Sequence, residues 1–159
     1  MIEIEKLRRY SDDVMDAIRA VHRELGPGLS ESVYQEGLKI ELTEKEIPFE
    51  KEFHFHPFYH GIKLEASYMM DFLVKSDIIV EIKSVGHKLD DEHRKQILNY
   101  MRLYQAPVGI LVNFYPSMIE IEEFFSLCNG ATLCAPPDHI VVSRAIFFGT
   151  FSKKFHIRP

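Results

Sequence analysis

The spacing of apolar residues predicts two helices in the first third of the chain. Apolar residues recur every three or four positions over residues 4–25, and this run ends at Gly26-Pro27-Gly28. Ser30, a residue type favoured at the N-cap, precedes a second helical run that reaches about Glu46. Ile47-Pro48 then breaks the pattern, because proline disrupts a helix interior.

The pattern next changes to the two-residue period that is typical of strands. Residues 49–59 alternate phenylalanines with charged residues and histidines, which indicates a half-exposed strand. After a turn at His60-Gly61, we expect a second strand over residues 62–74. A third strand is expected over residues 78–84 (IIVEIKS), and its mostly apolar composition predicts a central place in the sheet.

The remaining pattern completes an α/β domain. Asp90 is predicted to cap a helix that runs to about Tyr104, and two more strands are predicted over residues 108–114 and 118–125. The predicted order is ααβββαββ, which describes helices layered on a sheet. The chain has 159 residues, of which 46% are hydrophobic and 27% charged, so we expect residues 1–159 to form a single domain.

Composition also narrows the cellular setting. The chain has no apolar run long enough to cross a membrane, its N-terminus is charged, and its two cysteines cannot form a disulfide framework. We therefore expect a cytoplasmic protein. A net charge of −5 weighs against holding nucleic acid by bulk charge. After Asp138 the chain contains no acidic residue, and this tail is either a solvated end or a phosphate-facing patch. Its basic residues are Arg144, Lys153, Lys154 and Arg158.

Two charged residues interrupt the strand that is predicted to lie at the centre of the sheet. Glu81 and Lys83 are two positions apart, so both side chains point to the same face. Burying two charges on one face is unfavourable unless they pair or bind another group. The pattern therefore leaves two interpretations open: an ion pair between Lys83 and a carboxylate, or a binding site.

The preceding loop brings a second carboxylate to that face. If Lys75-Ser76-Asp77 forms the whole loop, Asp71 lies directly opposite Glu81, whereas a loop one residue shorter would turn Asp71 away. Two facing carboxylates repel each other, and a divalent cation that prefers oxygen ligands, such as Mg²⁺ or Mn²⁺, removes the repulsion. Lys83 is then placed to hold an attacking water or to stabilise charge on a phosphate.

Two predicted helices carry polar pairs whose spacing places each pair on one helix face. Glu31 and Tyr34 are three positions apart, and Gln96 and Tyr100 are four apart. The glutamine amide can bridge ligands, and the tyrosine hydroxyl can donate to a phosphate. A lone Glu31 is also explained by the helix dipole, and the second pair by the polar flank of an amphipathic helix.

Taken in order, these residues resemble the GxxExxY proteins of the PD-(D/E)XK nuclease superfamily over roughly residues 5–124. The matching positions are Gly28, Glu31 and Tyr34 for GxxExxY, Asp71 and Glu81-Ile82-Lys83 for D…(D/E)xK, Gln96 and Tyr100 for the QxxxY element of RecB-like members, and Asn113 for the closing strand. Met70 stands where the superfamily name has proline, and residues 125–159 form a C-terminal extension with no counterpart.

The resemblance implies a restriction-endonuclease-like core, in which a mixed β-sheet is flanked by helices. It also implies Mg²⁺- or Mn²⁺-dependent cleavage of phosphodiester bonds, with DNA expected in preference to RNA. Asp71 and Glu81 carry over as metal ligands, Glu31 as a further ligand or metal-water partner, and Lys83 as a catalytic residue. Gln96 and Tyr100 are counted with Lys83, Asp71 and Glu81 as catalytic residues. The residues predicted to contact substrate are Tyr34, Arg144, Lys153 and Lys154.

Two hypotheses from different classes follow. The first is a metal-dependent nuclease, which the intact Asp71, Glu81 and Lys83 favour. The second is a catalytically silent module that keeps the nuclease fold and binds nucleic acid or protein, which the acidic net charge favours. A nuclease of this size is expected to need a second subunit or a protein partner to grip its substrate.

Overall fold

The computed structural model describes residues 2–126 and 140–145, which form three helices and eight strands. The elements follow the chain in the order α1 (Ile2–Leu25), α2 (Glu31–Glu44), β1 (Phe49–Phe55), β2 (Phe58–Tyr59), β3 (Ile62–Lys63), β4 (Tyr68–Val74), β5 (Ile78–Lys83), α3 (Asp91–Tyr104), β6 (Val108–Asn113), β7 (Glu120–Ser126) and β8 (Ile140–Ala145). Both predicted helix starts are found, at Ser30 and at Asp90, and the Asp90 side chain accepts hydrogen bonds in a capping box.

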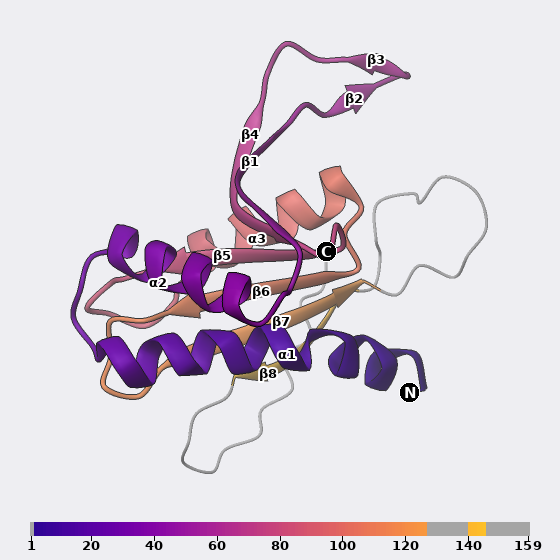
Figure 1. Ribbon diagram of the computed structural model, residues 1–159. Coiled ribbons are helices and arrows are strands. Elements are labelled where there is room, and N and C mark those ends of the chain that lie inside the picture. Colours follow the sequence, from indigo (N-terminus) through magenta and orange to yellow (C-terminus); the bar gives the residue numbers. More distant parts are fainter. Residues whose placement is uncertain (1, 127–139, 146–159) are drawn as a thin grey trace.

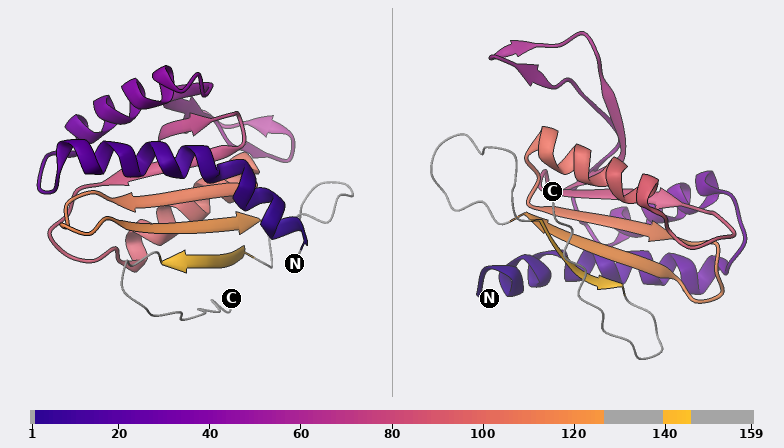
Figure 2. Two further views of the ribbon diagram at one scale, coloured as in Figure 1. Left: turned by 60° about the horizontal axis from the view of Figure 1, so that its bottom comes forward. Right: turned by 180° about the vertical axis from the view of Figure 1, so that it is seen from behind.

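Six strands form one sheet in the order β1-β4-β5-β6-β7-β8, and β2 pairs only with β3. β5 and β6 are parallel, while the other pairs are antiparallel, so the sheet is mixed. α1 and α2 cover one face and α3 covers the other (Figures 1 and 2). This arrangement confirms the predicted α/β class with a mixed sheet flanked by helices.

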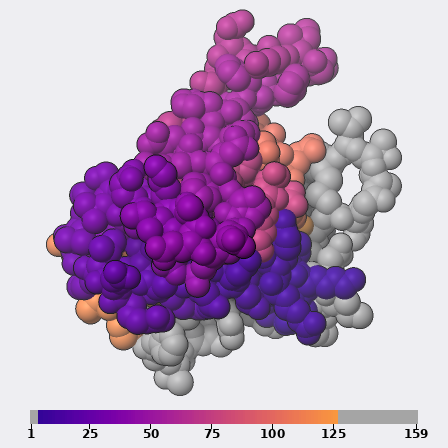
Figure 3. Space-filling view, in the orientation of Figure 1, coloured from indigo at the N-terminus to yellow at the C-terminus, as the bar shows by residue number. Residues whose placement is uncertain are grey.

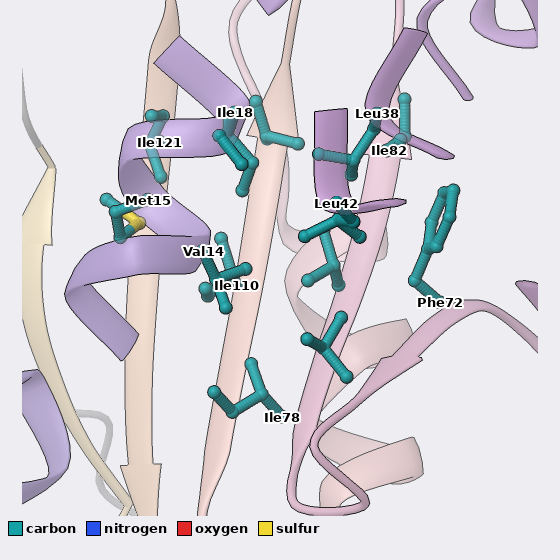
Figure 4. Packing of buried hydrophobic residues seen from close by; sticks show 14 of the residues in the cluster. Val14, Met15, Ile18, Leu38, Leu42, Phe72, Ile78, Ile82, Ile110 and Ile121 are labelled. Carbon is teal, nitrogen blue, oxygen red and sulfur yellow. The ribbon is translucent and has the colours of Figure 1, made fainter. Parts of the chain in front are cut away.

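Each face of the sheet buries its own set of apolar side chains. On the first face, α1 and α2 insert Val14, Ile18 and Leu38 among strand residues such as Ile82 and Ile110 (Figure 4). On the second face, α3 packs against the opposite side of β5 and β6. β5 is thereby covered on both sides, which explains its nearly continuous apolar sequence.

The predicted order of elements is wrong because each of two predicted strands is divided into two. In addition, β8 lies within the C-terminal segment, for which no counterpart in the family was expected. Residues 49–59 form β1 and β2 instead of one strand, and residues 62–74 form β3 and β4. The alternating pattern continues past Phe55, but all residues from 58 to 69 are exposed, so no core surface holds one continuous pairing there. With these changes and β8, the order is ααβββββαβββ.

Within residues 2–126 and 140–145, no helix combines the length and the apolar character that crossing a membrane would require.

Candidate functional site

The loop between β4 and β5 has the length on which the predicted site depends. Val74 pairs with Ile78, so Lys75-Ser76-Asp77 forms the entire loop. Both Lys75 and Ser76 have a positive φ, of 53° and 62°, a conformation that is uncommon for residues other than glycine. The loop therefore uses two left-handed residues to keep the register that aims Asp71 toward β5.

Regular pairing between β4 and β5 stops just before the two predicted carboxylates. The last pair in this ladder is Phe72 with Val80. The Ile82 backbone N–H donates instead to Asp71 Oδ2 at 2.7 Å. The Asp71 side chain therefore takes the place of a backbone acceptor where the strands diverge, and its negative charge acts on the nearby Glu81.

The Glu81 carboxylate is buried and only half paired. Its side chain is 4% exposed, and Oε1 accepts a hydrogen bond from Lys83 Nζ at 2.9 Å. Among the side chains of the described residues, Oε2 of Glu81 is the buried polar atom that has no hydrogen-bond partner. Burial raises the pKa of Glu81 to about 7, and the neighbouring Asp71 adds to the rise. The Lys83 ion pair is therefore present, but it accounts for one oxygen only.

Asp71 is held from the opposite side by α2. The Gln35 Nε2 group donates to Asp71 Oδ1 at 3.1 Å, so both carboxylate oxygens of Asp71 accept a hydrogen bond. Burial nevertheless raises the pKa of Asp71, and the charges of Glu31 and Glu52 raise it further. Gln35 was not predicted, although its place four residues after Glu31 puts both on one face of α2.

Glu31 lies at the same end of the sheet. Its Oε1 accepts from the Ser84 backbone N–H at 3.3 Å, directly after β5. The Ser84 hydroxyl in turn donates to the Leu29 carbonyl, so the entrance to α2 and the end of β5 are tied together. Glu31 also acts electrostatically on both Asp71 and Lys83. Glu31 is thus held at the end of β5, where its charge acts on Asp71 without closing a three-residue cluster of metal ligands among the described residues.

Lys83 supplies the positive charge of this cluster. Burial alone would lower its pKa, but the attraction of Glu81, Asp71 and Glu31 outweighs burial, and the net pKa is raised. Its side chain is 14% exposed. The ammonium group is therefore charged and partly accessible beside the two carboxylates.

Tyr34 has a different place from the one predicted. Its side chain is fully buried and stacks on Phe114, with ring centroids 4.5 Å apart. Its hydroxyl donates to the Gly26 carbonyl at 2.7 Å and accepts from the Leu29 backbone N–H at 3.0 Å. Both groups belong to the turn that leads to Glu31. Tyr34 thus holds the turn from within the core, and this position does not support the predicted contact with substrate.

Replacing Tyr34 with phenylalanine is expected to destabilise the protein by about 1–3 kcal/mol, because the hydroxyl bridges two part-buried backbone groups. The ring packing on Phe114 is kept. Chemical denaturation measures the loss, and Tyr115→Phe, which changes a half-exposed hydroxyl, is the control. Equal stability of Tyr34→Phe and the wild type would contradict the bracing role.

Gln96 and Tyr100 lie on α3, which covers the other face of the sheet from α2 (Figure 2). The Gln96 Nε2 group donates to the Tyr100 hydroxyl at 3.1 Å. The Tyr100 ring packs edge-on against Phe55 and Tyr68, where β1 and β4 leave the sheet. Within the described part of the chain, no hydrogen bond joins this pair to Lys83, so their part in catalysis stays a prediction.

Asn113 fixes the chain that follows β5. It is fully buried at the end of β6, and its Nδ2 donates to the carbonyls of Val85 and His87 at 3.0 and 3.1 Å. Its Oδ1 accepts from the backbone N–H groups of Val85 and Tyr115 at 3.0 and 3.2 Å. Asn113 was matched to the closing strand of the family, and in the structure it has a structural role beside the site.

The basic tail falls outside what can be compared with the prediction. Lys153 and Lys154 lie outside the described residues, and Arg144 lies in β8, where the side chains are not described.

The chemistry of the acids fits a divalent metal ion. Among the described residues, no three histidine, cysteine or acidic side chains gather closely enough to form a metal site by themselves. Asp71 and Glu81 nevertheless offer oxygen donors that repel each other, and Glu81 Oε2 is buried without a partner. Mg²⁺ is commonly held by one or two carboxylates, with water and substrate phosphate completing its shell. The oxygen donors of these two residues therefore suit a divalent metal ion.

The mixed sheet, with two facing acids and a lysine where its hairpin opens, defines a nuclease-type fold. The family model of the PD-(D/E)XK nuclease superfamily matches residues 8–124, and the chain belongs to this superfamily. In fold, the chain is similar to the crystal structure of SSO0001, with 22% identity and a TM-score of 0.47. The match covers 72% of this chain and 59% of the SSO0001 chain. No protein with a curated description matches the chain.

Proposed function

We propose that this protein is a Mg²⁺- or Mn²⁺-dependent nuclease that hydrolyses phosphodiester bonds, most naturally those of DNA. The observation that supports this most strongly is the buried Oε2 of Glu81, which has no partner and lies beside Asp71 and Lys83. A structural ion pair would satisfy both oxygens, whereas an open coordination position leaves one oxygen free. Asp71 and Glu81 would hold the ion, with Glu31 as a further ligand or as a partner of metal-bound water.

A bound metal ion supplies an activated water and polarises the phosphate. The other groups of the site belong to the chain itself. Gln35 and the Ile82 N–H orient the Asp71 carboxylate through 3.1 and 2.7 Å hydrogen bonds. Lys83, released from Glu81 when that carboxylate binds the ion, would place its ammonium group against the attacked phosphate, where negative charge develops.

The finer assignment to the GxxExxY proteins is part of the same proposal. Gly28 has a φ of 81°, a backbone conformation that favours glycine, at the turn that precedes α2. Glu31 follows it at the site, and Tyr34 braces the turn from the core. This local structure explains why a glycine, a glutamate and a tyrosine at this spacing would be needed together.

Cleavage of a panel of single- and double-stranded DNA and RNA tests the proposal directly. We expect cleavage with Mn²⁺ or Mg²⁺ and none with a chelator. If metal binds but the wild type cuts none of these substrates, the protein is a silent binding module instead of a nuclease.

Asp71→Asn is expected to abolish metal binding without unfolding the protein. An asparagine keeps an oxygen that can accept from the Ile82 N–H, but it removes one of the charges that attract the ion. In the wild type, Mn²⁺ binding should stabilise the folded protein by about 2.7 kcal/mol at a hundredfold excess over Kd, and this should raise the melting temperature. Differential scanning calorimetry of Asp71→Asn should show none of this rise.

Asp16→Asn is the matched control, because Asp16 makes an exposed ion pair with Arg19 on α1. It should keep the full metal-dependent rise. A normal rise in Asp71→Asn would remove Asp71 from the metal site.

A further inference from the structure

A narrow arm leaves the body of the protein next to the site. It comprises residues 56–69 and contains the β2–β3 hairpin at its tip, where His60 and Gly61 make the turn with φ values of 48° and 76°. All residues from 58 to 69 are exposed. The arm projects well beyond the helices and the sheet (Figures 1 and 3). Nothing in the described fold of a single chain explains why this segment is so far from the core.

The tip presents large apolar side chains to solvent. Phe58, Tyr59 and Ile62 are 68%, 66% and 70% exposed. Phe58 pairs with Lys63 and Tyr59 with Ile62, and side chains of paired residues share a face. One face of the tip therefore combines an aromatic ring with an ammonium group, and the other combines an aromatic ring with an aliphatic chain.

The arm is joined to the site through β4. Asp71 and the arm are parts of the same hairpin, and Tyr68 stacks on Phe55 at the base, with centroids 5.6 Å apart. Phe55 is itself buried against α3, so the base is anchored while the tip is free. Phe58 lies six positions after Glu52, so at most about 20 Å of extended chain joins the tip to a residue whose charge acts on Asp71.

We propose that the arm is a stacking platform for unpaired bases of the nucleic acid strand that is cut at the site. This inference rests on the proposed function and extends it to the substrate class: single strands, or duplexes with single-stranded ends. Proteins that bind single strands combine aromatic rings, on which bases of any sequence stack, with positive groups that follow the backbone. Phe58 beside Lys63 provides both, within the reach of several nucleotides from the metal site.

A second copy of the chain is the other occupant that an apolar tip suggests, and the arm suits it less well. The rings of Phe58 and Tyr59 would bury roughly 150–250 Å² each, even if they were fully covered. A standard protein interface buries about 800 Å² on each partner. Because these two adjacent residues point to opposite faces of the hairpin, one flat partner surface cannot cover both.

The absence of tryptophan from the sequence allows a direct test that does not depend on cleavage. Phe58→Trp places a single fluorophore at the tip, and Ile40→Trp, at a position 57% exposed on α2, is the matched control. Each variant is titrated in chelator with a 20-nucleotide single strand and with the same sequence as a blunt duplex. We expect the single strand, and not the duplex, to quench the emission of the Phe58 variant, and the Ile40 variant to be unaffected by both.

A second measurement uses the double substitution Phe58→Ala and Tyr59→Ala. Removing two stacking rings should weaken single-strand binding, measured by fluorescence anisotropy, by roughly tenfold or more. Ile40→Ala should bind like the wild type. Circular dichroism and thermal melting verify that the double variant is folded, which its exposed position predicts.

These experiments distinguish failure of the arm proposal from failure of the proposed nuclease function. Quenching of Phe58→Trp by single strands with no cleavage by the wild type would support the arm and contradict the nuclease. Cleavage without quenching, or equal quenching by the blunt duplex, would overturn the arm proposal alone. An emission change that depends on protein concentration without nucleic acid, together with dimers in sedimentation that the double alanine variant loses, would also overturn it in favour of self-association.

Discussion

Replacing Lys83 with methionine is expected to lower the rate of phosphodiester cleavage by roughly a hundredfold or more, the scale of losing one electrostatic group in a transition state. Methionine keeps much of the aliphatic packing of lysine but removes the ammonium group. Lys83 has no lone pair to offer a metal ion while it is charged, so the metal-induced rise in melting temperature should persist. The effect should therefore fall on turnover and not on metal binding.

The pH of this measurement matters because Lys83 is also the partner of Glu81. Loss of the 2.9 Å hydrogen bond removes an interaction that lowers the pKa of Glu81, so that pKa will rise further in the variant. Single-turnover rates and metal titrations should therefore be compared near pH 9, where more of Glu81 is ionised. Lys39→Met, an exposed substitution on α2, is the control. Cleavage by Lys83→Met at the wild-type rate would indicate a contaminating nuclease.

Replacing Glu81 with glutamine is expected to stabilise the metal-free protein at pH 8 by up to about 3 kcal/mol, while abolishing metal binding. Glu81 has a pKa of about 7 in the folded protein, against an ordinary value of 4.5. Because the folded pKa is raised, the contribution of Glu81 to stability is present below about pH 4.5 and is lost as the pH rises through about 7. Glutamine has no proton to lose and stays neutral, so the gain appears at pH 8 and shrinks toward pH 5.

Denaturant titration in chelator at both pH values measures this difference. Glu122→Gln is an informative control, because Glu122 is also buried but is fully engaged by Arg94, at 2.7 and 2.8 Å, and its loss should destabilise. If Glu81→Gln is less stable than the wild type at pH 8, the Lys83 pair is a net stabilising ion pair. That result would favour the structural interpretation that the sequence leaves open, and it would weaken the case for a metal site.

The placement of Asp71 beside β5 could be predicted from the sequence, because a short stretch of chain fixes the geometry there. Asp71 and Glu81 belong to one hairpin, so an odd loop and the two-residue period of strands are enough to place them together. The mostly apolar composition of residues 78–84 also identifies β5 as a central strand, and the N-cap residue Asp90 marks the start of α3. These features depend on neighbours that are close along the chain.

What sequence analysis missed depends on the direction of side chains in space. Both Tyr34 and Gln35 lie within one turn of Glu31, and spacing alone does not show which of them enters the core. In the structure Tyr34 is buried and Gln35 reaches Asp71. Likewise, the alternation of residues 49–59 suits a strand, but only the sheet determines that the pairing of β1 with β4 ends at Phe55.

The way β4 and β5 part also has a consequence for folding. Residues 72–80 pair across a three-residue loop, so forming this part of the hairpin loses little chain entropy. We therefore expect it to form early in folding. β5 and β6, in contrast, are parallel and must wait for the crossover through α3. Beyond Phe72 and Val80, repulsion between the carboxylates of Asp71 and Glu81 opposes further strand pairing. The acids should therefore meet last, once the surrounding layers have already confined them.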